Sequence, residues 1–171
     1  MRNMKALIIL LTILTVQVKS YKFSASSDGC SAAVYRVLDD ARRNVLYSDD
    51  EDLLCDDLLP PGWYRFMEAG RSRVLSDTCQ QTCGTESPAW LDTSSLTNLT
   101  RDTQEGHVCV SWSWPGMSDC CLYTLPVTIK HCQDFIVYYL QPTQACNVAY
   151  CSRKGKRHVI SGSTWKTGNF F

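Results

Sequence analysis

The chain has few of the residues, and none of the motifs, on which most enzymes depend. Its 171 residues include only three histidines, His107, His131 and His158, and no catalytic motif surrounds them. It lacks the Gly-x-Ser-x-Gly elbow, the His-Glu-x-x-His motif and a phosphate-binding glycine loop. Oxidised cysteines would leave no thiol nucleophile either. We therefore expect no enzyme and no cofactor, with a small hydrolase built on paired carboxylates as the catalytic alternative.

Long hydrophobic runs are absent after the N-terminal segment, so no membrane span is expected. A short basic region precedes an apolar run over residues 6–16, which is shorter than the roughly 20 residues that a span requires. Residues 18–20 then resemble a signal-peptidase site. The pattern predicts a secretory signal peptide over residues 1–20, cleaved after Ser20, and hence a secreted, extracellular protein.

The cysteines lack the paired two-residue spacings of zinc ribbons and fingers, so no metal site is expected. Their even number in a secreted chain predicts five disulfides, although the sequence leaves the pairing open. The adjacent Cys120 and Cys121 should bond to different partners, because a bridge between neighbours is strained. The ten cysteines are Cys30, Cys55, Cys79, Cys83, Cys109, Cys120, Cys121, Cys132, Cys146 and Cys151.

Basic residues are scarce between the first and the last cysteine. This region has eight Lys and Arg residues against sixteen Asp and Glu residues, a net charge of −8, although the whole chain is formally neutral. Such a balance argues against binding to nucleic acid or to anionic membranes. The acidic residues 49–52 and 56–57 lack the ligand pattern of an EF-hand, so they predict a solvated loop rather than a calcium site.

Several segments rich in aromatic and β-branched residues favour short strands. The aromatic residues 63–66 predict a strand, with residues 74–75 in its partner. Residues 127–129 and 135–140 are rich in β-branched and aromatic side chains and predict a β-hairpin.

Two further segments complete the expected organisation. Residues 87–106 are polar and turn-rich, which predicts a long surface loop, and residues 32–43 fit either a short helix or a strand with a turn. We expect a small disulfide-rich domain over residues 30–151, mostly β with one or two short helices (α+β). A linker over residues 21–29 would precede it, and a basic tail over residues 152–171 would follow.

The basic tail has two interpretations. Lys156-Arg157 is a dibasic pair with Lys154 two positions before it, which resembles a proprotein-convertase site with cleavage after Arg157. A solvated basic segment without processing is the slightly favoured interpretation. Cleavage would favour a signalling ligand with a removable tail as an alternative function.

One modification site is expected on the surface. Asn98-Leu99-Thr100 is the chain's single N-glycosylation sequon and falls within the expected polar loop. In a protein that passes through the secretory pathway, we expect Asn98 to carry a glycan.

The tryptophans leave a choice between packing and binding. Trp112 and Trp114 alternate, so both would lie on one face of a strand, where they could stack on sugars or fill the core. Core packing is favoured, because the domain has few large apolar residues. Arg65 lies between aromatic residues and is expected to stack on them or to pair with an acidic neighbour.

The pattern of residues resembles the ten-cysteine domain of uromodulin and of the pancreatic zymogen-granule membrane glycoprotein. The resemblance covers residues 30–151. Its marks are Cys55-Asp56, Leu58 and Gly62-Trp63-Tyr64-Arg65-Phe66, then Pro88-Ala89-Trp90-Leu91, the pair Cys120-Cys121, and Ala149-Tyr150-Cys151.

The resemblance implies a secreted or surface glycoprotein without catalytic activity. Members present glycans and protein surface to partners, which include bacterial adhesins. Two family sequons have no counterpart, because Trp90-Leu91 continues into Asp92 and because Tyr139 occupies the other position. The sequence therefore predicts an extracellular binding module whose partners are extracellular proteins or lectin-type adhesins, with Asn98 as the position of its glycan.

Overall fold

The computed structural model describes residues 28–49, 52–79 and 83–155. The expected signal peptide, its cleavage position Ser20 and the dibasic position Arg157 lie outside these ranges and stay predictions. Among the described residues, no helix has the length and apolar character to cross a membrane. The described part is mostly β-structure crosslinked by five disulfides, which confirms the expected fold class.

Nine strands of the described residues form one sheet with the order β8-β4-β5-β6-β7-β2-β3-β9, and β1 pairs with β2 beside this path. Residues 32–43, which fitted either a helix or a strand, contain both a short strand and a 3-10 turn. The elements are β1 (Arg36–Leu38), η1 (Ala41–Arg43), β2 (Gly62–Glu68), β3 (Arg71–Leu75), β4 (Ser87–Thr100), β5 (Thr103–Trp114), β6 (Met117–His131), β7 (Ile136–Leu140), β8 (Val148–Tyr150) and β9 (Ser152–Lys154).

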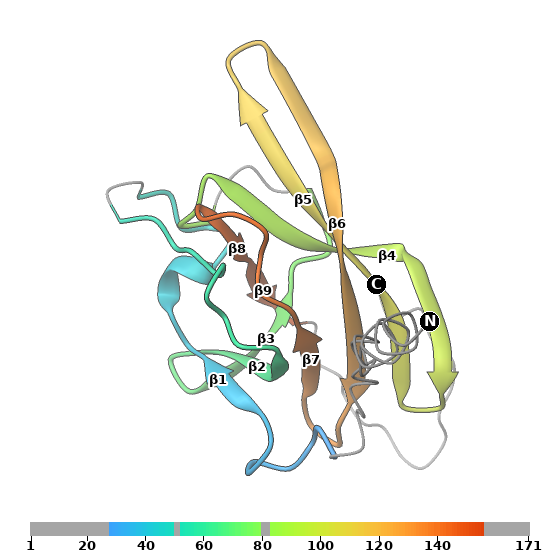
Figure 1. Ribbon diagram of the computed structural model, residues 1–171. Helices are drawn as coiled ribbons and strands as arrows, with labels where there is room; N and C mark the ends of the chain where they lie inside the picture. The colour runs from blue at the N-terminus through green and yellow to red at the C-terminus, as the bar shows by residue number, and fades with distance from the viewer. Residues whose placement is uncertain (1–27, 50–51, 80–82, 156–171) are drawn as a thin grey trace, which may run out of the picture.

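The chain itself joins the two ends of this strand order. β8 pairs with β4 and β9 pairs with β3, and only Cys151 separates β8 from β9. The Cys151 N–H donates to the Ala89 carbonyl at 3.1 Å, and its carbonyl accepts from the Ser76 N–H at 2.8 Å. The sheet therefore curls until its ends meet around the core (Figure 1).

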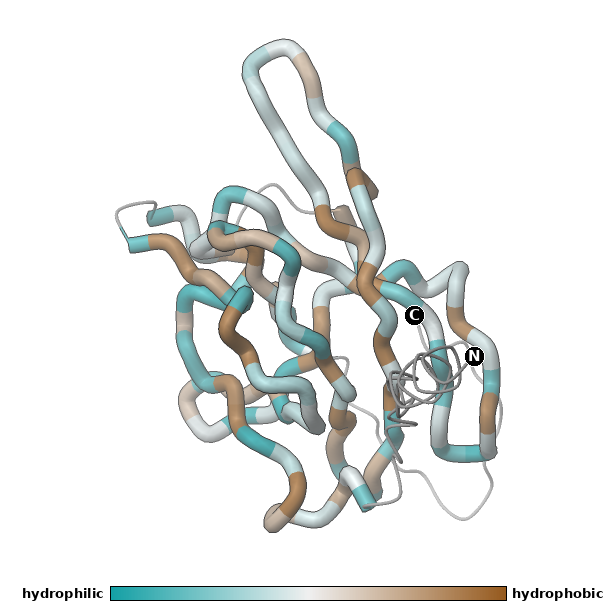
Figure 2. Tube along the Cα trace, viewed as in Figure 1, coloured by the Kyte–Doolittle hydropathy of each residue, from teal (hydrophilic) through white to brown (hydrophobic). Residues whose placement is uncertain are grey.

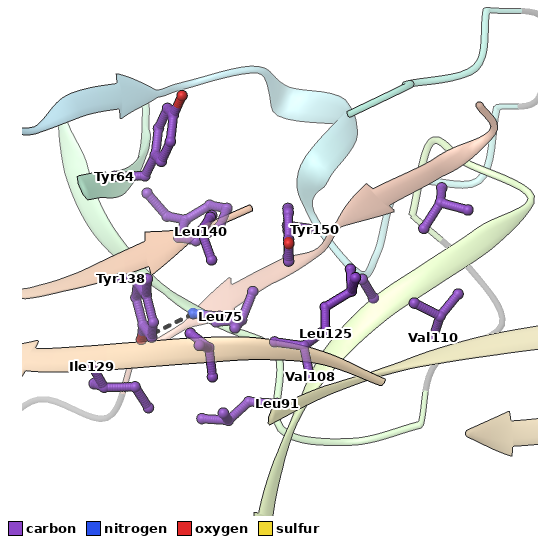
Figure 3. Packing of buried hydrophobic residues seen from close by; sticks show 14 residues of the cluster. Tyr64, Leu75, Leu91, Val108, Val110, Leu125, Ile129, Tyr138, Leu140 and Tyr150 are labelled. Carbon is purple, nitrogen blue, oxygen red and sulfur yellow. Dashed lines mark hydrogen bonds between the residues drawn. The ribbon is translucent and has the colours of Figure 1, made fainter. Parts of the chain in front are cut away.

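The main core lies inside the curled sheet (Figure 3). Phe66 and Tyr150 are fully buried, and Tyr138 packs edge-on against Phe66 with 5.6 Å between ring centroids. The Tyr138 hydroxyl accepts a hydrogen bond from the Leu75 N–H at 3.2 Å. Burial of these rings stabilises the fold, because each Å² of apolar surface removed from water contributes about 25 cal/mol.

The opposite face of β2 and β7 carries a second, smaller cluster, because alternate side chains of a strand point to opposite faces. Trp63 and Tyr139 meet there edge-on at 5.6 Å, with Val137 buried beside them. Gly29 lies so close to the Trp63 indole that a Cβ atom would be 2.7 Å from it. This cluster attaches the N-terminal part of the domain to the sheet.

The predicted hairpin over residues 127–140 is confirmed. β6 and β7 are antiparallel, with Thr128 opposite Tyr139 and Ile129 opposite Tyr138. The strand over residues 63–66 is also confirmed and continues through a turn into β3. Val74 and Leu75 lie in β3 as expected, but they pair with β9.

The expected long loop over residues 87–106 is wrong. β4 and the first four residues of β5, 103–106, occupy this region, and the two strands pair antiparallel. Ala89 and Leu91 point inward and are buried, as are Val108 and Val110 on β5. The Ser and Thr residues that suggested a loop lie mainly toward the distal end of β4, where residues 97–100 are all exposed, so that both faces of the strand are open to water there.

Five disulfides use all ten cysteines, which confirms the predicted number. Cys120 and Cys121 bond to different partners, as expected. Cys55, Asp57 and Cys146 lie close enough together to resemble a metal-binding site. The two cysteine sulfurs are bonded to each other, however, so they offer no thiolate ligands. The pairs are Cys30–Cys132, Cys55–Cys146, Cys79–Cys120, Cys83–Cys151 and Cys109–Cys121.

Candidate functional site

Asn98 lies on the exposed distal part of β4, close to the turn into β5. It stands opposite Gln104 of β5, and its Oδ1 accepts a hydrogen bond from Gln104 Nε2 at 3.0 Å. The Gln104 Oε1 in turn lies 3.2 Å from His131 Nε2 on β6. This contact engages the amide oxygen of Asn98 and not Nδ2, the atom to which an N-linked glycan is attached.

An irregularity in β4 positions this end of the strand. The pairing of β4 with β5 shifts register between Asp92 and Thr97. The Ser95 hydroxyl accepts from the His107 N–H at 2.9 Å and donates to the Asp92 carbonyl at 2.6 Å, so it supplies hydrogen bonds where the ladder is interrupted. Gly106 permits this approach, since a Cβ atom there would lie 2.7 Å from Ser95 Oγ. The local sequence therefore sets where Asn98 is presented.

Tyr139, which replaces a family sequon, belongs to the interior and not to a glycan-bearing surface. Its side chain is only 8% exposed and packs against Trp63. Burial raises the pKa of its hydroxyl. Among the described residues, Asn98 is thus the only sequon position, and it is exposed.

The acidic region around Cys55 is solvated only in part, which corrects the expected loop. Asp52 is exposed and pairs with Arg42, but Asp56 is 2% exposed. Arg43, which is also buried, binds Asp56 through two hydrogen bonds of 2.7 Å each. Asp56 Oδ2 also accepts from the Tyr150 N–H at 2.9 Å. This carboxylate is a structural element that ties η1 to β8.

Arg65, His107 and His131 make contacts that hold the fold together. Arg65 stacks on aromatic rings as expected, with its guanidinium carbon 3.9 Å from the centroid of Phe135. His107 Nε2 lies 3.9 Å from Asp92 Oδ2. His131 contacts Gln104. In the part of the chain that the structure describes, these contacts place neither imidazole against a nucleophilic side chain.

The favoured interpretation of the tryptophan pair was wrong for Trp114, which is 66% exposed. Trp112 is partly buried, and the two rings lie parallel with an interplanar angle of 7° and centroids 6.5 Å apart. Both tryptophans lie near the C-terminal end of β5. This end of β5 and the start of β6 project together from the body of the molecule (Figure 1). Core packing fails because, among the described residues, the pairing of β4 with β5 ends at Val110 and β5 and β6 continue as a pair without a further strand.

The family profile of the uromodulin-like domain matches residues 64–152, just over half of the chain. The chain belongs to this family. The uromodulin-like match contains eight of the ten cysteines. The other two, Cys30 and Cys55, bond to Cys132 and Cys146 inside it, so the segment before residue 64 is crosslinked to the uromodulin-like region.

Curated relatives support the same assignment. The chain is similar to pancreatic secretory granule membrane major glycoprotein GP2 of Mus musculus, with 32% identity over 125 residues, 69% of this chain and 22% of that protein. It is also similar to uromodulin of Rattus norvegicus, with 34% identity over 113 residues, 62% of this chain and 15% of that protein. The aligned part thus spans less than a quarter of either relative's length. Membership of this family supports an extracellular, disulfide-stabilised module.

Proposed function

We propose that the chain is a secreted extracellular binding module that presents an N-linked glycan on Asn98 to lectin-type partners such as bacterial adhesins. The observation that carries this proposal is the geometry of the sequon. Asn98 and Thr100 are exposed at the outer end of β4, and Gln104 holds the Asn98 amide by its oxygen. The glycan would extend into solvent from a strand that is fixed to the sheet.

The family resemblance supports this role, because its members present glycans to adhesins. The two family sequons that this chain lacks leave Asn98 as the single attachment point, so glycan-dependent binding must depend on it. The contacts of His107, His131 and Asp56 are those of structural groups and support a module without catalytic activity.

The test compares substitutions that differ only in whether the sequon survives. The chain is produced in mammalian secretory cells, and occupancy of Asn98 is measured by mass spectrometry. Asn98→Gln and Thr100→Ala remove the sequon, whereas Thr100→Ser keeps it. Binding to an immobilised mannose-specific adhesin should be lost with the first two and retained with the third.

Stability provides the control for this experiment. Because Asn98 and Thr100 are exposed, all three variants should unfold within a few degrees of the unsubstituted protein. The proposal is refuted if Asn98 is unoccupied in the secreted protein, or if Asn98→Gln binds the adhesin as strongly as the unsubstituted protein.

A further inference from the structure

The projecting ends of β5 and β6, residues 111–122, form a two-stranded arm that closes at Pro115 and Gly116 (Figure 1). Gly116 has a φ of +86°, which suits the residue after proline in a type II turn. Figure 2 shows the arm largely in pale shades, with brown segments toward its base. It is a surface feature of this chain that the glycan proposal does not use.

One face of the arm gathers its large side chains. Trp112 stands directly opposite Asp119, and Trp114 directly opposite Met117, whereas Ser113 and Ser118 pair between them. Since alternate residues of a strand point to opposite sides, these four side chains share a face, which we call the tryptophan face. Trp114 and Met117 are 66% and 67% exposed. Aromatic and Met side chains exposed together are typical of interaction surfaces.

The arm is held to the body at its base. Both bridges attach to its β6 strand: Cys109–Cys121 ties that strand to β5, and Cys79–Cys120 ties it to the segment before β4. The Trp90 Nε1 donates to the Cys120 carbonyl at 2.8 Å. Asp119 Oδ1 accepts from the Cys121 N–H at 2.8 Å. A partner would therefore meet an arm whose base is already ordered, which reduces the entropic cost of binding.

Charge defines the chemistry of the partner. Asp119 lies on the tryptophan face, and Glu86 and Asp119 both line a hollow beside Trp112. The sequence contains no Lys or Arg between residues 102 and 129, and the region from the first to the last cysteine has a net charge of −8. Indole rings attract cations through their faces, and carboxylates pair with them. A neutral sugar could hydrogen-bond to these carboxylates, but only a cation would also form an ion pair with them.

We propose that the tryptophan face binds a basic segment of a partner protein, in which an Arg or Lys side chain lies against Trp112 and Trp114 and pairs with Asp119 and Glu86. This inference is independent of the glycan on Asn98. Both sites could operate on one molecule, because Asn98 lies at the opposite end of β5 from the arm, where residues 103–105 pair with β4.

The test uses a peptide of arginines without aromatic residues as the probe, titrated into the full-length secreted protein while tryptophan emission is measured. The peptide should change the emission, and its affinity should fall as salt rises. Trp112→Ala combined with Trp114→Ala should weaken binding about tenfold, measured by calorimetry because the variant lacks the reporter rings. Asp119→Asn should weaken it several-fold.

Controls separate this site from general attraction between opposite charges. The double tryptophan variant keeps the net charge, so general attraction would leave its binding unchanged, and that result would overturn the proposal. Leu58→Ala removes another exposed apolar side chain, which is 87% exposed, and should have no effect. Asn98→Gln should also bind the peptide normally, which distinguishes this site from the glycan. A neutral mannose oligosaccharide that changes the tryptophan emission where the peptide does not would likewise contradict it.

Discussion

Replacement of Asp56 by asparagine tests the buried ion pair at the centre of the fold. The side chains of Arg43 and Asp56 are only 8% and 3% exposed, and two hydrogen bonds of 2.7 Å join them. Asparagine keeps the size of the side chain but removes its charge and one acceptor oxygen. Arg43 would stay protonated and would then be a buried cation without a counter-ion.

The expected loss of unfolding free energy is about 3–5 kcal/mol, the range observed when one member of a buried ion pair is removed. The Tyr150 N–H now donates to Asp56 Oδ2 at 2.9 Å. If the asparagine turns its amide nitrogen toward this N–H, the N–H loses its acceptor and the loss of unfolding free energy increases. A smaller loss would be expected only if water reached the site.

The matched control is Asp40→Asn. Asp40 pairs with Arg42 at 2.6 Å, but both side chains are a quarter to a third exposed. Asparagine also keeps the N-cap of η1, where Asp40 accepts from the Arg42 N–H. The loss here should be at most about 1 kcal/mol.

Guanidinium unfolding with intact disulfides, followed by tryptophan fluorescence, gives both values by linear extrapolation. Arg43→Met in the Asp56→Asn background should cause no further loss, because it removes the unpaired cation. If Asp56→Asn and Asp40→Asn lower the unfolding free energy equally, the buried pair does not have the role that its geometry indicates.

Three further outcomes are expected. Burial raises the pKa of Tyr138 and Tyr150, so these tyrosines ionise at lower pH in the unfolded state than in the native state. The free energy of unfolding should therefore fall as pH rises above about 10. Tyrosinate absorbance should show fewer than all eight tyrosines titrating in the native protein, and a single transition of all eight near pH 10 would contradict this. Gly106→Ala should lower the thermal midpoint through a loss of about 1–3 kcal/mol, because the new Cβ would meet Ser95 Oγ at 2.7 Å; an unchanged midpoint would mean that β4 adjusts freely. Thiol titration of the denatured, unreduced protein should find no free thiol, and two reactive thiols per chain would refute the disulfide assignment.

The sequence predicted β2, β7 and the part of β6 that pairs with β7, where β-branched and aromatic residues are most concentrated. β2 and β7 are flanked by two hydrophobic clusters, so they contain dense aromatic and β-branched runs. The distal part of β4 is exposed on both faces at residues 97–100, and the Ser95 hydroxyl replaces a ladder partner where the pairing is interrupted. Its composition is therefore that of a loop, and only the partner strand β5 makes it a strand.

The buried ion pair and the disulfide pairing could not be predicted from the sequence, because they depend on contacts between residues that are distant in the chain. Asp56 is one of several acidic residues in its segment, and only Arg43 and Tyr150 distinguish it as buried. The number of disulfides followed from composition, but their pairing follows from the topology. The arm could have been found, because Pro115-Gly116 is a turn signal between two strand-like segments.

The disulfide pairing has a consequence for how the chain is made. The first five cysteines, Cys30 to Cys109, each bond to one of the last five, Cys120 to Cys151. Synthesis proceeds from the N-terminus, so five thiols emerge before any of their native partners exists. Every bridge formed during that interval is non-native and has to be exchanged later by thiol attack. Correct oxidation of this domain is therefore a late event, which depends on thiol exchange once nearly the whole domain has been translated.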